Sequence, residues 1–409
     1  MVRSALTALS ASTLLAALGT SIANVGLPAI SQAFGASFQA VQWVVIAYLL
    51  AITVLIVGAG RLGDVVGRRR LLLAGIGVFT AGSLLCGVAP TLWLLVAARA
   101  VQGTGAAVMM ALTMALVSDA VPAARTGSAM GLLGTMSAVG TALGPTLGGV
   151  LIAAFGWHAL FLANVPLGAA ALLFAHRYLP DDLALRAGPR AAPPHGLIET
   201  LRNSAIIGGL VMNALVSTVM MATLVVGPFY LTRGLGLPPV IVGMVMSTGP
   251  VAAALSGVPA GRLADRIGVF HATLIGLGTM VAGTILLAAS RIAGGAAAYV
   301  APLVVLTVGY AVFQAANNTA VMSGAASDRR GAVAGVLGLS RNVGLVAGAS
   351  VMGAVFAYAA GGDAAVAPAH AVAQGMRASF AVAAVLISVA LAVALKQRTV
   401  RQVAGGFVA

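Results

Sequence analysis

The chain has 409 residues, of which 60% are hydrophobic and only 7% are charged, and its formal net charge at pH 7 is +14. In soluble domains about a quarter of the residues are charged, so this composition excludes a water-soluble protein of two or three domains. Apolar runs of about twenty residues repeat along the chain, and a helix of that length spans the hydrocarbon core of a bilayer. The sequence therefore predicts an all-α membrane protein.

Twelve such runs predict twelve transmembrane helices. In chain order they occupy residues 5–27, 40–60, 71–89, 92–118, 128–153, 160–179, 204–231, 239–260, 270–289, 298–322, 332–358 and 375–395. The first run is too long for a signal peptide and is followed by no convincing small-residue cleavage site, so we expect it to be retained as a helix.

Positive charges concentrate in alternate loops. Seventeen arginine and lysine residues fall on the side of the N-terminus, and only Arg233, Arg291 and Arg377 fall on the opposite side. This asymmetry places both termini in the cytoplasm. It also assigns the net charge to membrane topology, which argues against nucleic acid as a partner. Cys86 is the single cysteine, so no intramolecular disulfide is possible.

An internal repeat divides the chain into halves. The segment Gly60–Gly67 after the second run returns as Gly261–Gly268 after the eighth, 201 positions later, and four glycines near the fifth run return 204 positions later near the eleventh. Parallel six-helix repeats occur in secondary transporters, whose substrate site lies between the halves near the membrane midplane. We expect a six-helix half at 1–179, a cytoplasmic linker at 180–202, a second half at 203–397 and a cytoplasmic tail at 398–409.

The fifth run has a glycine pattern of its own. Gly140, Gly144 and Gly148 recur every four residues and share one helix face, so a neighbouring helix can approach closely. Pro145 removes one backbone hydrogen bond and bends the helix there. Gly149 follows directly. Glycines in a membrane helix can also serve packing alone, and the spacing by itself does not separate the two interpretations.

Several segments resemble exporters of the major facilitator superfamily. The spacing from Gly131 to Gly149 is similar to their fifth-helix signature. Further segments with this resemblance are Leu18–Pro28, Gln42-Trp43 with Tyr48, Gly60–Arg70, Arg99–Gly103 and Trp157–Gly168. They look like the drug:proton antiporters of the fourteen-helix type, although the linker lacks the two extra central helices. The resemblance implies a twelve-helix major facilitator fold with two pseudo-symmetric halves, and proton-linked efflux by alternating access.

Residues of a conformational gate are implied by the same resemblance. Asp64 and Arg68 are four residues apart and can pair on one helix turn, and Asp119 ends the fourth run on the same side. In the superfamily such charges form a cytoplasmic latch; the alternative is a solvated loop whose arginines only set topology. The predicted gate comprises Gly60, Asp64, Gly67, Arg68, Asp119, Gly140, Gly144, Pro145, Gly148 and Gly149.

Acidic residues are absent from the centres of the predicted helices. All eight map to loops or helix ends, and Gly19 stands where the antiporters carry an acid. A carboxylate inside the membrane is the usual proton carrier, so proton coupling would lack its usual group. Arg99 and Arg341 do lie within helices, where each costs about 2.5–3.5 kcal/mol on insertion scales and should face protein or water.

The predicted substrate site combines these arginines with neutral polar side chains from both halves. Its residues are Asn24, Gln42, Tyr48, Arg99, Gln102, Gln314, Asn317, Asn318 and Arg341. Two alternatives stay open. A single amide in a membrane helix more often joins helices than binds ligand, and Arg99 can have a structural role by bonding to backbone carbonyls of the first helix.

These observations predict an exporter of small organic molecules in the bacterial inner membrane, working as a monomer without cofactor or metal. Anionic or neutral substrates are favoured, because the cavity has cationic and no anionic side chains. The alternative on the same fold is an importer or facilitator of a sugar or organic acid. An intramembrane enzyme would need a histidine pair or a serine–histidine pair within helices, and the sequence offers neither.

Overall fold

The computed structural model describes the backbone of residues 2–120, 126–179, 204–323 and 330–405, and the side chains of these residues except 2–4, 64, 118–120, 126–131, 204–205, 330–332 and 398–405. Within these ranges the secondary structure is helical and contains no strand. Twelve of the described helical segments are long and apolar enough to span a membrane. The all-α fold and the twelve predicted spans are thereby confirmed.

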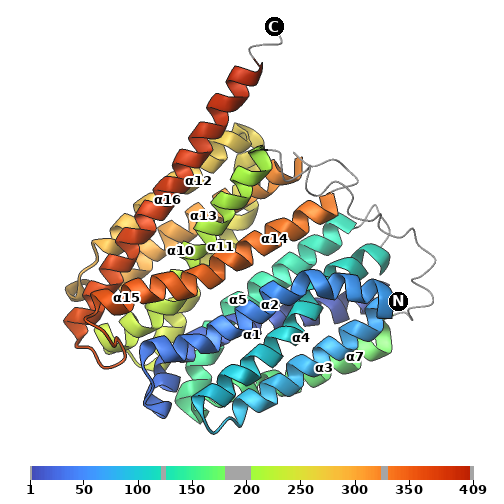
Figure 1. Ribbon diagram of the computed structural model, residues 1–409, viewed down its shortest axis with the longest axis horizontal. Helices are drawn as coiled ribbons and strands as arrows, with labels where there is room; N and C mark the ends of the chain where they lie inside the picture. The colour runs from blue at the N-terminus through green and yellow to red at the C-terminus, as the bar shows by residue number, and fades with distance from the viewer. Residues whose placement is uncertain (1, 121–125, 180–203, 324–329, 406–409) are drawn as a thin grey trace. The chain divides into compact units, whose positions relative to one another are not determined.

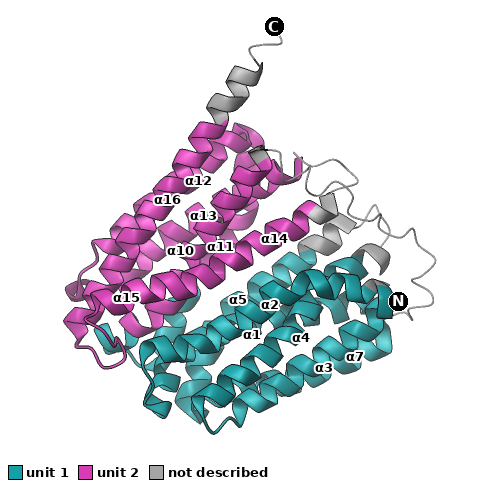
Figure 2. Cartoon of the chain, in the orientation of Figure 1, with its two compact units in different colours: residues 1–190, 231–250 teal, residues 191–230, 251–409 magenta. Residues whose placement is uncertain are grey.

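Unit 1 comprises Met1–Arg190 and Leu231–Pro250 (Figure 2). Its helices are α1 (Val2–Phe34), α2 (Phe38–Val66), α3 (Arg68–Gly87), α4 (Leu92–Ala120), α5 (Thr126–Phe155), α6 (Ala159–Leu162) and α7 (Asn164–Tyr178), with the first part of α11. α6 and α7 together form the sixth predicted span. α1 packs along α5, and α4 packs against both α2 and α3 (Figure 1).

Unit 2 comprises Ala191–Tyr230 and Val251–Ala409. Its elements are α10 (Ser204–Phe229), the rest of α11 (Pro239–Ile267), α12 (Val269–Ala288), the 3₁₀-helix η3 (Ile292–Gly294), α13 (Ala297–Ser323), α14 (Arg330–Ala347), the π-helix η4 (Gly348–Met352), α15 (Gly353–Ala359) and α16 (Ala369–Gly405). A second π-helix, η2 (Tyr230–Gly234), follows α10 directly. α10 packs against α14 and α16, and α12 packs against α13.

The internal repeat reappears in how the helices pack within each unit. A methyl group added to Gly75 of α3 would lie 3.3 Å from Gly105 O of α4, and one added to Gly276 of α12 would lie 2.9 Å from Gly309 O of α13. The same pairs of glycines, 201 and 204 positions apart in sequence, therefore bring equivalent helices into backbone contact. Such close approach is what small residues provide in membrane bundles.

Single glycines make the joints that begin the third helix of each repeat. Gly67 lies between α2 and α3 with φ +112°, and Gly268 lies between α11 and α12 with φ +83°. These values fall where L side chains are strained and glycine is not. Glycine thus recurs at this position of the internal repeat because the backbone conformation there favours it.

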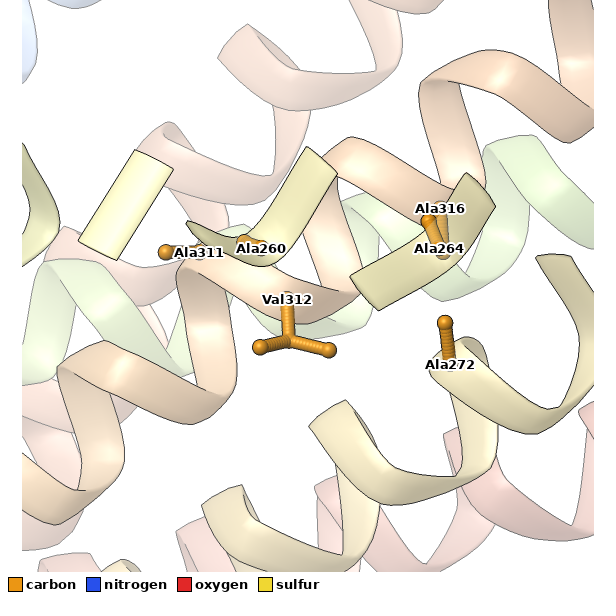
Figure 3. Close-up of a cluster of buried hydrophobic side chains, with 6 residues drawn as sticks. All are labelled: Ala260, Ala264, Ala272, Ala311, Val312 and Ala316. Carbon is orange, nitrogen blue, oxygen red and sulfur yellow. The ribbon is translucent and has the colours of Figure 1, made fainter. Parts of the chain in front are cut away.

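Small residues also form a core in unit 2. Three helices meet in a cluster of buried side chains, drawn in Figure 3, that consists of Ala260, Ala264, Ala272, Ala311, Val312 and Ala316. Alanine methyl groups leave room for α11, α12 and α13 to pack closely, because dispersion contacts and not water exclusion drive helix association in lipid.

Candidate functional site

The glycine face of α5 lies against α1. A methyl group on Gly140 would lie 2.6 Å from Leu14 O, and one on Gly144 would collide with the side chain of Ser21. Ser21 Oγ also donates a hydrogen bond to Gly140 O at 3.2 Å. The spacing that the sequence shows therefore serves a close crossing of α5 on α1, to which α5 contributes no side chain at these glycines.

Gly149 lies on a different face of α5 and contacts α11. A methyl group on Gly149 would lie 3.2 Å from the Cα of Gly243, and one on Gly243 would collide with Pro145 O. Beside this crossing, Ser247 Oγ donates to Ala142 O at 2.9 Å. A hydroxyl has one proton, so the 2.5 Å hydrogen bond between Ser247 and Thr146 Oγ1 is donated by the threonine.

Arg99 is the centre of a buried polar network in unit 1. Its side chain is 0% exposed. Arg99 Nε donates to Val44 O of α2 at 2.9 Å, and Nη1 donates to Gly19 O of α1 at 3.2 Å and to Gln102 Oε1 at 2.5 Å. The guanidinium carbon lies 4.0 Å from the ring centroid of Tyr48, a favourable cation–π contact.

Neighbouring side chains extend the network to a fourth helix. Gln102 Nε2 donates to Ser83 Oγ of α3 at 2.7 Å, and Tyr48 OH donates to Ala16 O of α1 at 3.2 Å. Asn24 Nδ2 donates to Thr20 O within α1 at 3.0 Å. The network thus ties α1, α2, α3 and α4 together through one arginine.

These contacts match the structural alternative for Arg99, since one acceptor is a carbonyl of the first helix. The substrate-site assignments of Asn24, Gln42, Tyr48, Arg99 and Gln102 remain predictions; all five side chains are buried. An acid at Gly19, as in the antiporters, would require the Phe79 ring to move. A methyl group there would lie 2.7 Å from Phe79 Cζ.

The predicted site residues of unit 2 divide by exposure. Asn317 is 1% exposed and donates through Nδ2 to Gly209 O of α10 at 3.2 Å, so it joins two helices. Gln314 and Asn318 are half-buried, and Arg341 on α14 is exposed. Asn213, which the sequence prediction missed, is also 1% exposed and bonds to Leu337 O and Ser340 Oγ of α14. An asparagine within an apolar run was the available signal.

The latch residues are described only in part. The side chains of Asp64 and Asp119 lie outside the described residues, and Arg68 is half-buried at the start of α3. Gly60 has open space around it, and Gly67 forms the joint between α2 and α3. The ion pair of the latch therefore remains a prediction.

The acidic residues whose backbone is described lie at helix ends or between helices. Asp64, Asp119 and Asp265 lie in the last turns of α2, α4 and α11, and Asp363 lies between α15 and α16. In the described part of the chain no carboxylate occupies a helix centre, as the sequence predicted.

Twelve spanning helices in two repeated sets are the architecture of a multi-pass membrane transport protein. The sequence pattern of the Major Facilitator Superfamily matches residues 9–349, and the chain belongs to that family.

Relatives include both named and uncharacterised transporters. The chain is 29% identical to the uncharacterised transporter YebQ of Escherichia coli, over 83% of this chain and 85% of the relative. It is 27% identical to the riboflavin transporter RibZ of Clostridioides difficile, over 83% and 85%. It is 28% identical to the multidrug resistance protein Stp of Mycobacterium tuberculosis, over 82% and 72%. Drug-resistance proteins are thus among its relatives.

Solved structures share the fold. A bacterial homologue of the human lysosomal transporter Spinster, in an inward-facing and occupied conformation, aligns with a TM-score of 0.78 at 16% identity over 95% of each chain. A variant of the nucleoside transporter NupG aligns with a TM-score of 0.78 at 13% identity, over 95% of this chain and 99% of the other. At these identities the likeness concerns the fold alone.

Proposed function

We propose that this protein exports small organic molecules, drugs or metabolites, across the cytoplasmic membrane by alternating access. The observation that carries the proposal is the Gly140–Gly149 stretch. Three of its glycines fit against α1 and the fourth against α11, and its spacing resembles the exporter signature. The drug-resistance relatives support the same direction of transport.

A cation gradient drives this export in our proposal. The resemblance to drug:proton antiporters makes the proton the first ion to test. The described helices offer no carboxylate at their centres, so a proton would have to be carried differently from the usual intramembrane acid.

Anionic or neutral compounds are the substrate class that we propose. Arg99 is enclosed by carbonyl oxygens and its neighbour Gln102, which spread its charge over protein dipoles. Arg341 is exposed and is the better placed of the two to meet a ligand. A positive charge in a site of low dielectric favours anions, because Coulomb energies grow as the effective dielectric falls.

A measurement of the direction of transport tests the proposal. Inside-out vesicles containing the protein should accumulate fluorescent compounds when a gradient is imposed, and vesicles with the variant Gly144→Leu should not. Accumulation only in right-side-out vesicles would support the alternative, a facilitator or importer. The riboflavin transporter among the relatives makes riboflavin a suitable member of the compound set.

Membrane orientation belongs to the same proposal. Both termini lie in the cytoplasm of a bacterial cell in the topology that the arginine distribution favours. Reporter fusions at residues 1 and 409 should both show the cytoplasmic phenotype, and a periplasmic signal from either end would contradict the orientation.

A further inference from the structure

Three helices of unit 2 enclose a polar layer. α10 and α13 run antiparallel, because Asn317 of α13 bonds to Gly209 O near the start of α10, at 3.2 Å, while Tyr299 OH donates to Thr223 O near its end, at 3.4 Å. α14 packs against both helices. The polar layer therefore lies in a seam between three helices of one half.

An apolar cluster closes this seam on one side. Its residues come from α10, α13 and α14, and those of α10 and α13 lie one to two turns from the two asparagines. The buried members are Ile206, Val321 and Val333, and the side chains packed on them are Leu210, Met322 and Leu337. The polar side chains consequently lie in surroundings where an unpaired oxygen is costly.

Two amide oxygens in the layer have fixed orientations. Asn213 Nδ2 donates to Leu337 O at 3.1 Å and to Ser340 Oγ at 2.8 Å, and Asn317 Nδ2 donates to Gly209 O. A backbone carbonyl only accepts, so these contacts require the nitrogen and leave each Oδ1 pointing elsewhere. Both Oδ1 atoms are buried and accept no hydrogen bond from the described residues. A buried acceptor of this kind needs a donor or a cation.

A further oxygen lies about one turn away. Gln314 is one turn from Asn317 on α13, and its Oε1 is buried without a hydrogen bond from the described residues. In the antiparallel pair, one turn along each helix brings Asn213 and Gln314 to the same height. The amide oxygens of Asn213, Gln314 and Asn317 therefore fall within about one helical turn along the seam.

The other half of the molecule shows that the fold does not require this layer. By the repeat of helix contacts, Thr13 and Thr113 correspond to the two asparagines. Thr13 Oγ1 donates to Leu9 O at 3.0 Å and Thr113 Oγ1 donates to Met109 O at 2.6 Å, each within its own helix. At these two positions unit 1 therefore has no counterpart to the two amide oxygens.

We propose that Asn213, Gln314 and Asn317 form a binding site for a sodium ion, which rests on the proposed function in that sodium would be its coupling ion. Neutral carbonyl oxygens replace the hydration shell of monovalent cations in channels and coordinate sodium in transporters. Arg341 follows Ser340 directly in sequence, but its side chain is exposed, whereas the amide oxygens of the layer are buried. This assignment also gives the transporter an ion site that needs no carboxylate.

Sodium binding is tested first on the purified protein without substrate. Replacing potassium chloride by sodium chloride at constant ionic strength should raise the melting temperature saturably, by about 3 °C. Asn317→Leu and Asn213→Leu should remove the sodium effect. Thr113→Val, at the counterpart position in unit 1, should retain it. An equal response to both salts in the unmodified protein would overturn the proposal.

Gln314→Glu keeps the test decisive if the leucine variants fail to fold. No hydrogen bond of the described residues depends on the Gln314 amide, and a carboxylate adds charge to the layer. The half-saturating sodium concentration should fall about tenfold, since a nearby anion strengthens cation binding. An unchanged or higher value would contradict the site.

Transport separates the sodium proposal from the proposed function. In proteoliposomes, export driven by a sodium gradient at equal pH, and lost in Asn317→Leu, supports both. Export driven by a pH gradient and indifferent to sodium would overturn the sodium site and leave the exporter intact. A saturable sodium effect on melting without export under any gradient would support the site and contradict the exporter.

Discussion

Arginine side chains within the helices have two different environments. Arg99 makes three hydrogen bonds and a cation–π contact inside unit 1, whereas Arg341 is exposed on α14. Arginine therefore joins helices by hydrogen bonds in unit 1, whereas the arginine side chain on α14 of unit 2 is exposed. Insertion cost alone, which is equal for both at the sequence level, does not distinguish these roles.

Arg99→Lys should destabilise the protein by about 2 kcal/mol, because a single ammonium cannot reproduce the planar donors that reach two helices and Gln102. Denaturant unfolding in detergent measures the loss. Arg291→Lys, at an exposed position, is the matched control and should change stability little. Equal stability of the two variants would show that the Arg99 network contributes no net energy.

Arg341→Gln should weaken transport of anionic compounds about tenfold and leave neutral ones unchanged, since one unit charge in a partly dehydrated site is worth about 1–2 kcal/mol. Initial rates for a matched anionic and neutral pair give the ratio. If both rates fall together, Arg341 serves the fold and does not select charge. The complementary substitution Gly19→Asp requires the Phe79 ring to move, because a methyl group at Gly19 would lie 2.7 Å from Phe79 Cζ.

Element by element, α5 shows how one helix can contact two neighbours through different glycines. Gly140, Gly144 and Gly148 face α1, and Gly149 faces α11. α11 itself begins in unit 1 and ends in unit 2. A side chain on either glycine face would separate helices that now touch through backbone atoms.

Gly144→Leu combined with Pro145→Ala should leave the protein inserted but reduce transport more than about tenfold, because the leucine would displace Ser21 and the crossing would open. Gly134→Ala on the same helix is the control, since no atom lies within 4 Å of a methyl group placed there. Membrane yield and transport rate are measured together. Normal transport by the double variant would show that the spacing serves packing alone.

The predicted latch at the joint between α2 and α3 can be tested through the charge of Asp64. Asp64→Asn should lower turnover about tenfold while substrate affinity changes little, because the charge biases conformations and does not touch ligand. Reversing both charges, Asp64→Arg with Arg68→Asp, should restore part of the rate if the two pair directly. Weaker substrate binding at an unchanged turnover would assign Asp64 to the substrate site.

At the scale of the whole molecule, sequence reasoning recovered the class, the number of spans and the repeat. Hydropathy is sufficient for this, because lipid forces every spanning segment to satisfy its own backbone hydrogen bonds. The boundaries were less accurate: α1 runs from Val2 to Phe34 instead of 5–27, and the eleventh span contains the π-helix η4. π-helices are rare single-turn interruptions of α-helices, and the hydropathy pattern of the eleventh run does not mark this one.

Site residues were harder to predict than spans, for a physical reason. The direction in which an amide oxygen points depends on the carbonyl that the amide nitrogen reaches, as Asn317 and Asn213 show. That partner lies on another helix, more than one hundred positions away in sequence. The two halves also differ in polarity at corresponding positions of the repeat. Where unit 1 has Arg99 and Gln102, unit 2 has Leu303 and Leu306.

We propose that this transporter exports anionic or neutral molecules, and its described helices have no carboxylate at their centres. The most direct test of this proposal is substrate accumulation in inside-out proteoliposomes, with a charge series built on one scaffold and a pH or sodium gradient imposed. We expect accumulation of the anionic and neutral members, with rates at least about tenfold above that of the quaternary ammonium member. Robust accumulation of the permanent cation, unchanged in Arg341→Gln, would contradict the account.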